Sequence, residues 1–167
     1  MTRNLRVLAV LGLTAGGVLG MAGSMVGASN VRAVCWAIDA TGVIVATAIL
    51  ALSYLRAGKM EVAAGFLVYA IGEGIMLTGT SMSLDASVPA FAAGTALWSA
   101  GLALVSVPRE FALFTRLTGL IAAVLFGVVS LRINKPTLNW PPATELAEEI
   151  TRAIIRPKVR KQSLAPG

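Results

Sequence analysis

Residues 61–82 read EVAAGFLVYAIGEGIMLTGTSM, a run of about twenty mostly apolar residues that is long enough to cross a bilayer as a helix. One acid, Glu73, stands near the middle of the run, between Gly72 and Gly74. A carboxylate in hydrocarbon costs at least ~2.5 kcal/mol on insertion scales, so this side chain must face a packed interior or water, or stay protonated. Glu73 is therefore the strongest functional signal in the sequence, and it indicates a place rather than an activity.

Four further apolar runs of similar length accompany this segment. Together they predict about five transmembrane helices, at about residues 7–28, 33–55, 62–82, 88–107 and 112–131. Hydrophobic residues make up 56% of the 167-residue chain and charged residues only 13%, whereas a soluble domain carries about 25% charged residues. The sequence therefore predicts an all-α integral membrane protein, built as a bundle of about five transmembrane helices.

The first run has a second interpretation, because it follows a basic start and ends in small residues that suit a signal-peptide cleavage site before Ser29. Its uncharged length of about 22 residues exceeds the apolar region of a usual signal peptide, which is about 7–15 residues. The length favours a retained membrane helix, and a cleaved signal peptide stays the alternative.

The composition changes after Arg132. Residues 1–135 form the predicted transmembrane helical domain, and residues 136–167 form an extramembrane tail that begins with a proline-rich stretch. Over residues 144–156, apolar side chains recur with a period of about 3.6, which predicts a C-terminal amphipathic helix. Such a helix can lie on the membrane surface, dock on a partner or stay solvated.

The basic residues near the ends of the predicted spans indicate the orientation. Because consecutive spans alternate direction, one face of the membrane collects Arg3, Arg6, Arg56, Lys59, Arg109 and Arg116, and the other collects Arg32, Arg132 and Lys135. The positive-inside rule favours a cytoplasmic N-terminus in a cell (inner) membrane. Five basic residues of the tail, from Arg152 to Lys161, argue for the opposite orientation, but they lie about twenty residues or more beyond the last span, where the rule weakens.

Small residues recur every four positions in the first and fifth spans, at Gly12, Gly16 and Gly20 and again at Gly119 and Gly127. Such spacing lets a second helix approach closely. The second helix can belong to the same bundle, to another copy of the chain or to a membrane-protein partner. Internal packing is the favoured interpretation.

Two acids lie well inside the spans, and their depths match. Counted from the same face of the membrane, Asp39 lies about 6 residues in and Glu73 about 9, which is roughly 10 and 14 Å at the helical rise. Asp85 stands in the predicted turn above them. If Asp39 and Glu73 face each other, they would not both ionise easily, and one is expected to keep a proton at neutral pH. Asp39, Glu73 and Asp85 are therefore the candidates for a proton or cation site, while the favoured interpretation is structural, with the two acids hydrogen-bonded separately.

The remaining sequence argues against most catalytic classes. The chain has no His and one cysteine, Cys35, which excludes an intramolecular disulfide and the usual His-ligated haem and metal sites. Phosphate-binding, nucleophile-elbow and zinc-protease motifs are absent from the sequence. We therefore expect no enzymatic activity, no metal and no cofactor. The net charge of +6 is interpreted as a topology signal rather than a nucleic-acid surface, which leaves the lipid bilayer as the expected partner.

Two functional hypotheses follow from these features. The first is a structural or accessory helical bundle, supported by the small-residue faces and the shortage of chemistry. The second is a small transporter or channel component that uses intramembrane Glu73 and Asp39 for proton or cation coupling. In general style the chain resembles small bacterial inner-membrane proteins of four to six helices. This resemblance carries no diagnostic motif and implies no activity.

Overall fold

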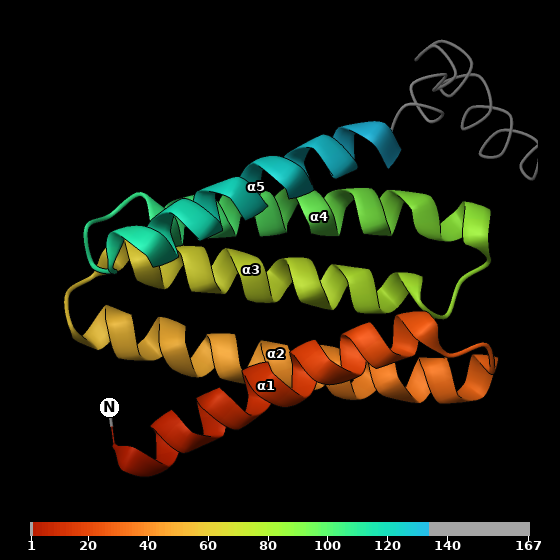
Figure 1. Cartoon of the computed structure of the whole chain (residues 1–167), viewed down its shortest axis with the longest axis horizontal. Coiled ribbons are helices and arrows are strands. Elements are labelled where there is room, and N and C mark those ends of the chain that lie inside the picture. The colour runs from red at the N-terminus through yellow and green to blue at the C-terminus, as the bar shows by residue number, and fades with distance from the viewer. Residues whose placement is uncertain (1, 134–167) are drawn as a thin grey trace, which may run out of the picture. The chain divides into compact units, whose positions relative to one another are not determined.

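The computed structural model describes residues 2–133, apart from the side chain of Leu84, and these residues form an all-helical unit (Figure 1). Its helices are α1 (Arg3–Met25), α2 (Ser29–Arg56), α3 (Met60–Gly79), α4 (Leu84–Ser106) and α5 (Leu113–Ile133). All five are long and apolar enough to cross a membrane, which confirms the predicted all-α class with five such segments. The helix predicted at residues 144–156 lies outside the described residues.

The helix boundaries differ from the predicted ones by a few residues, mostly where polar side chains flank the apolar runs. α1 begins at Arg3 and already ends at Met25, and α2 begins at Ser29 and so includes Arg32. Hydropathy marks the part of a helix that is apolar, whereas a helix continues through arginine and serine when its backbone hydrogen bonds are kept. α4 likewise starts before the apolar run and carries Pro89 in its second turn.

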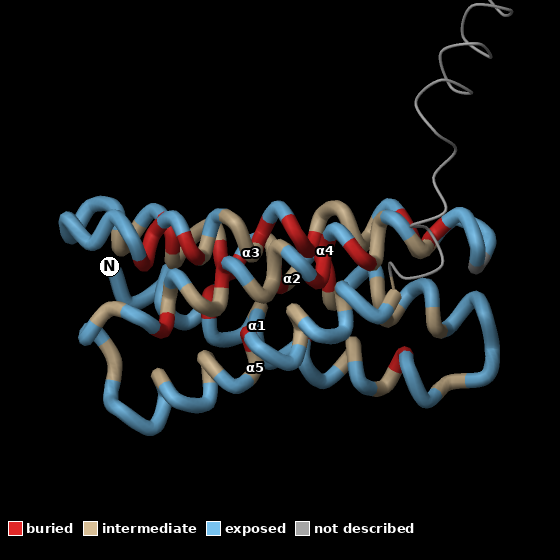
Figure 2. Tube along the Cα trace, turned by 90° about the horizontal axis from the view of Figure 1, so that it is seen from above, coloured by how far each residue is buried: buried red, intermediate tan, exposed pale blue. Residues whose placement is uncertain are grey.

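Consecutive helices pack against each other as antiparallel neighbours, in the order α1–α2, α2–α3, α3–α4 and α4–α5. Figures 1 and 2 show that α2, α3 and α4 form one layer, and that α1 and α5 lie on the same face of this layer, over its two edges. α3 therefore lies in the middle of this layer, between α2 and α4.

Glycine contacts set the closest approaches between helices. A Cβ on Gly65 of α3 would lie 2.8 Å from the carbonyl oxygen of Gly101 of α4, and a Cβ on Gly72 would lie 2.9 Å from that of Gly94. These glycines thus bring the α3 and α4 backbones to a separation that no larger residue would permit.

The same principle joins α1 to α2. A Cβ on Gly12 would lie 2.6 Å from the carbonyl oxygen of Gly42, and a Cβ on Gly16 would lie 2.6 Å from Cγ2 of Val43. Gly20 follows on the same face. The predicted small-residue face of α1 is therefore used for a contact within the chain.

Hydroxyl groups join α4 to α5. Ser99 Oγ donates to the carbonyl oxygen of Ala123 at 2.7 Å, and Ser130 Oγ donates to that of Ala92 at 2.8 Å. The predicted packing glycines of α5 face the same helix: Gly127 lies against Ser99, and Gly119 lies against Ser106. Both contacts are again internal to the chain.

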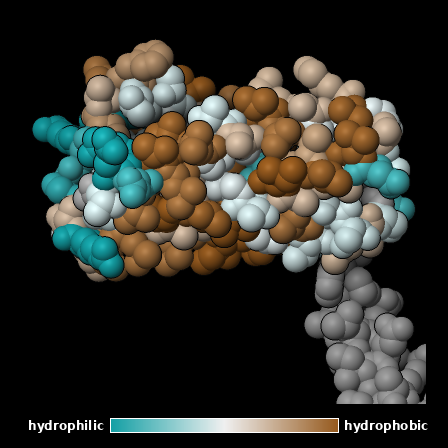
Figure 3. Space-filling view, turned by 90° about the horizontal axis from the view of Figure 1, so that it is seen from below, coloured by the Kyte–Doolittle hydropathy of each residue, from teal (hydrophilic) through white to brown (hydrophobic). Residues whose placement is uncertain are grey.

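One end of the helical unit is polar, as the hydrophilic cluster in Figure 3 shows. There Lys59, in the α2–α3 turn, pairs with Glu110, in the α4–α5 connection, at 2.7 Å. Arg116 donates through Nε and Nη2 to the carbonyl oxygens of Ser106 and Val107, at 2.9 and 2.8 Å. These bonds satisfy carbonyl groups that are left open at the C-terminus of α4.

Candidate functional site

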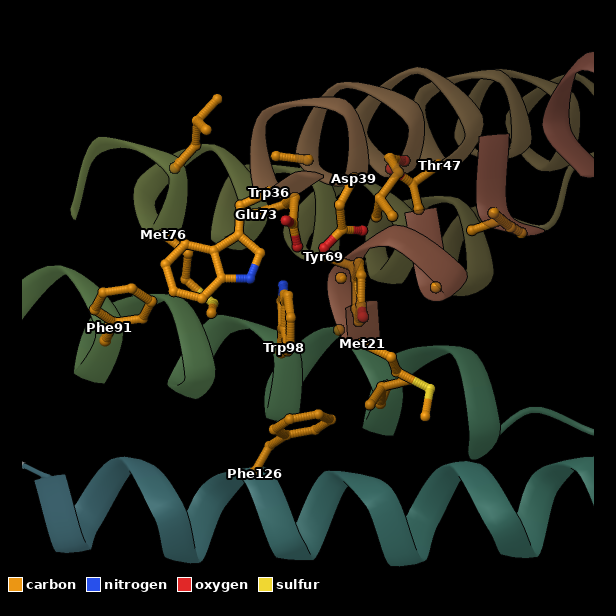
Figure 4. Close-up of a pocket in the computed structure, with 18 of the residues that line it drawn as sticks. Met21, Trp36, Asp39, Thr47, Tyr69, Glu73, Met76, Phe91, Trp98 and Phe126 are labelled. Carbon is orange, nitrogen blue, oxygen red and sulfur yellow. The ribbon is translucent and has the colours of Figure 1, made fainter. Parts of the chain in front are cut away.

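A cavity of about 720 Å³ lies between α1 and α5, over α3, and all five helices contribute to its lining (Figure 4). Most of the lining side chains are apolar or aromatic. Asp39 and Glu73 are the only acidic residues that line it within residues 2–133, and no basic residue of that range lines it. The cavity therefore concentrates negative charge in an apolar setting.

Glu73 lies in the second half of α3, is only 5% exposed, and points into the cavity (Figure 4). The contact of Gly72 with Gly94 holds this part of α3 close to α4. The one ion pair formed within residues 2–133, Lys59–Glu110, lies at the polar end and does not involve Glu73. A buried carboxyl group without a basic partner is tolerated when it carries a proton or when a cation reaches it from outside the chain.

Asp39 lies on α2, and its half-buried carboxyl group occupies space that two α1 glycines leave open. A Cβ on Gly16 would lie 3.0 Å from Asp39 Oδ1, and a Cβ on Gly20 would overlap the carboxyl group itself. The glycines predicted for helix packing therefore also make room for an acidic side chain between α1 and α2.

The two acids are brought together. Their carboxyl groups point toward each other across the cavity in Figure 4, and they are close enough to interact electrostatically. Tyr69, one turn before Glu73 on α3, lines the same cavity. Asp85 is not part of this group: it is exposed in the first turn of α4 and does not line the cavity.

Aromatic rings enclose the acid pair. The ring of Tyr69 stacks on that of Trp98 of α4, with centroids 5.1 Å apart and an interplanar angle of 2°. Phe126 of α5 meets Trp98 edge-on at 5.0 Å. Trp36 of α2 also lines the cavity, with the guanidinium carbon of Arg32 5.7 Å from the centroid of its ring. These rings fix the shape of the cavity on three of its sides.

The indole N–H of Trp98 is the polar group best placed to act on the acids. Its nitrogen is buried and points toward the carboxyl group of Glu73, but it does not meet the geometry of a hydrogen bond to any group within residues 2–133 (Figure 4). An N–H dipole with this direction favours a negative charge on Glu73 or a hydrogen-bond acceptor placed between the two groups.

Sequence reasoning did not identify the aromatic members of the site. Tyr69 and Glu73 are four residues apart and so share one face of α3, a signal that was available. The stacking of Tyr69 on Trp98 instead depends on the register between α3 and α4. No group of three or more His, Cys, Asp or Glu side chains able to hold a metal occurs in the described part of the chain.

The chemistry of the site is that of a carboxyl pair in an aromatic cavity. Such a pair can exchange a proton and can neutralise a cation that enters the cavity. The lining hydroxyl of Thr47 already donates to the carbonyl oxygen of Val43, at 2.7 Å. Comparison of the chain with protein-family models, with curated proteins and with solved structures gives no match.

Proposed function

We propose that the protein is a multi-pass membrane protein in which α1–α5 cross the cell (inner) membrane, and that it acts as a small transporter or channel component coupled to protons or cations. The observation that carries the proposal is the meeting of Asp39 and Glu73 in one cavity, without a basic residue among the lining residues of the described range. Intramembrane acids that face a cavity typically serve ion or proton pathways.

One form of the first hypothesis, an accessory subunit that binds partners through its small-residue faces, is less well supported than a self-contained bundle. The glycines concerned make contacts inside the chain, as in the pairs Gly12–Gly42 and Gly127–Ser99. A face already covered by another helix of the same chain is not free to bind a partner helix.

The cavity lining extends along much of the length of the helices and reaches Val105, next to the C-terminal residue of α4. The lining also reaches Ser24 and Thr80, at the C-terminal ends of α1 and α3. Toward the other end lies Phe66, whose ring stacks on that of Tyr54 with centroids 5.6 Å apart. Beyond this ring pair comes the polar end with its ion pair.

A flux measurement tests the proposed function. Purified protein in liposomes should transport protons, sodium or potassium ions faster than protein-free liposomes, and Glu73→Gln should reduce that flux at least about tenfold, because Gln keeps the shape of Glu but carries no exchangeable charge. Glu61→Gln is the matched control, since Glu61 is an exposed acid at the start of the same helix. A wild-type flux no higher than the blank, or equal flux in both variants, would refute the proposal.

Orientation has its own test, in a background where Cys35 is replaced by alanine. A cysteine at Ala57, exposed beside the α2–α3 turn, should resist an impermeant thiol reagent in intact cells. One at Ala86, exposed in the first turn of α4, should be labelled. The reverse pattern would place the N-terminus outside, and equal labelling of both would point to dual insertion.

A further inference from the structure

We propose that the cavity binds a hydrophobic organic cation with a single charge, such as a quaternary ammonium or an arylphosphonium ion. The charge would lie at the Asp39–Glu73 pair and the apolar groups against the aromatic wall. This inference names the substrate class of the site and rests on the function proposed above.

The charge of the site selects a monocation. Two facing carboxyl groups in an apolar cavity do not readily ionise together, so the pair offers about one negative charge. Glu73 is 5% exposed, points into the cavity and has no basic partner in the described range. A ligand with one positive charge therefore matches the pair, whereas a neutral or anionic ligand would leave a buried charge unpaired or meet repulsion.

The wall of the cavity selects an organic ligand. Aromatic side chains from four helices line it: Trp36 from α2, Phe66 and Tyr69 from α3, Phe91 and Trp98 from α4, and Phe126 from α5. The faces of such rings attract cations, most strongly cations that shed water easily, and they also bury the apolar groups attached to the charge.

The size of the cavity agrees with this class. A volume of about 720 Å³ lies in the range of roughly 300–1,000 Å³ that drug-sized ligands occupy. A bare divalent ion needs about six or more oxygen ligands. Apart from the two carboxyl groups, the lining side chains of the described range contribute only four hydroxyl oxygens, those of Ser24, Thr47, Tyr69 and Thr80.

A charge-reversed pair of probes tests the inference. Tetraphenylphosphonium and tetraphenylborate have nearly the same size and hydrophobicity but opposite charge. In equilibrium dialysis with protein in nanodiscs, the phosphonium ion should bind saturably above the level of empty nanodiscs, and the borate ion should not. The double variant Asp39→Asn, Glu73→Gln should weaken phosphonium binding at least about tenfold, because no negative charge is left at the pair, and Glu61→Gln should leave it unchanged.

The aromatic wall is tested by variants with a matched control. Trp98→Leu should weaken phosphonium binding by about 2- to 13-fold, the range expected for loss of one aromatic contact from the wall. Phe114→Leu should not change it, because Phe114 lies on α5 and is 78% exposed on the outside of the unit. Trp36→Leu provides a second test of the wall if the Trp98 variant fails to fold.

The outcomes separate this inference from the proposed function. Equal binding of both probes, or phosphonium binding that the double substitution of Asp39 and Glu73 does not weaken, overturns the inference, because the binding would then be hydrophobic only. Absence of phosphonium binding alongside Glu73-dependent proton or sodium flux also overturns it and leaves the transport function standing. Phosphonium binding that depends on the Asp39–Glu73 pair, without any flux, supports the inference and refutes the transport function.

Discussion

A leucine at Gly72 is expected to prevent assembly of the helical unit, whereas a leucine at Gly74, two residues further along the same helix, should be tolerated. A Cβ on Gly72 would lie 2.9 Å from the carbonyl oxygen of Gly94 and 3.0 Å from Cδ1 of Trp98, while a Cβ on Gly74 would meet nothing within 4 Å. A backbone carbonyl cannot move aside as a flexible side chain does. The cost of overpacking should thus reach or exceed the upper end of the usual range of about 1–3 kcal/mol.

The two variants control for each other, because both replace a helical glycine beside Glu73 and both gain the same helix propensity, about 0.8–1 kcal/mol. The measurements are the yield of monodisperse protein in size-exclusion chromatography and the free energy of unfolding by denaturing detergent. Equal yields and equal unfolding free energies would show that the contact of α3 with α4 does not hold the unit together.

The five helices were predictable because the length and apolarity of a segment are local properties of the sequence. The ends of the helices were less so. Residues 29–32 read SNVR and were assigned to a connection, yet they form the first turn of α2. Polar residues of this kind belong to a helix without belonging to the apolar part of it, and hydropathy measures only that part.

The closest helix contacts were predictable only in part. The four-residue spacing of Gly12 and Gly16 marked the face of α1 that packs on α2. On α3 and α4 the glycines at the closest contacts are instead seven residues apart, Gly65 and Gly72 facing Gly101 and Gly94, a spacing that a four-residue pattern does not mark. Seven residues are close to two helical turns, so it marks one face of a helix equally well.

For the candidate site, the sequence predicted the depth of the two acids along their helices but not the direction in which their side chains point. The helical rise places Asp39 and Glu73 at similar depths in the membrane. This result depends only on α2 and α3 being antiparallel and joined by a short turn. Whether they face each other depends on the rotation of each helix about its axis, which packing against α1 and α4 determines. The same argument explains Asp85: its level above the pair was correct by sequence, but it lies exposed at the start of α4 and outside the cavity lining.

Neutralising the two acids one at a time and together should give strongly non-additive changes in stability. When both carboxyl groups are ionised they repel each other, so Asp39→Asn or Glu73→Gln alone should each remove the repulsion, and the second substitution should add little to the first. At pH 9 we expect a coupling energy of about 1–3 kcal/mol in the double-mutant cycle. Protonation of either carboxyl group removes the repulsion, so the coupling should become smaller as the pH is lowered from 9 to 5.

The control cycle pairs Asp39→Asn with Asp85→Asn. Asp85 lies near the same end of the unit as the acid pair but is exposed and outside the cavity, so its substitution should add to that of Asp39 within about 0.3–0.5 kcal/mol at both pH values. Unfolding free energies in mixed detergent micelles provide the measurement and require no knowledge of the ligand. Additive effects of Asp39→Asn and Glu73→Gln at pH 9 would mean that the two carboxyl groups titrate independently. In that case a single shared negative charge could not be what selects the ligand.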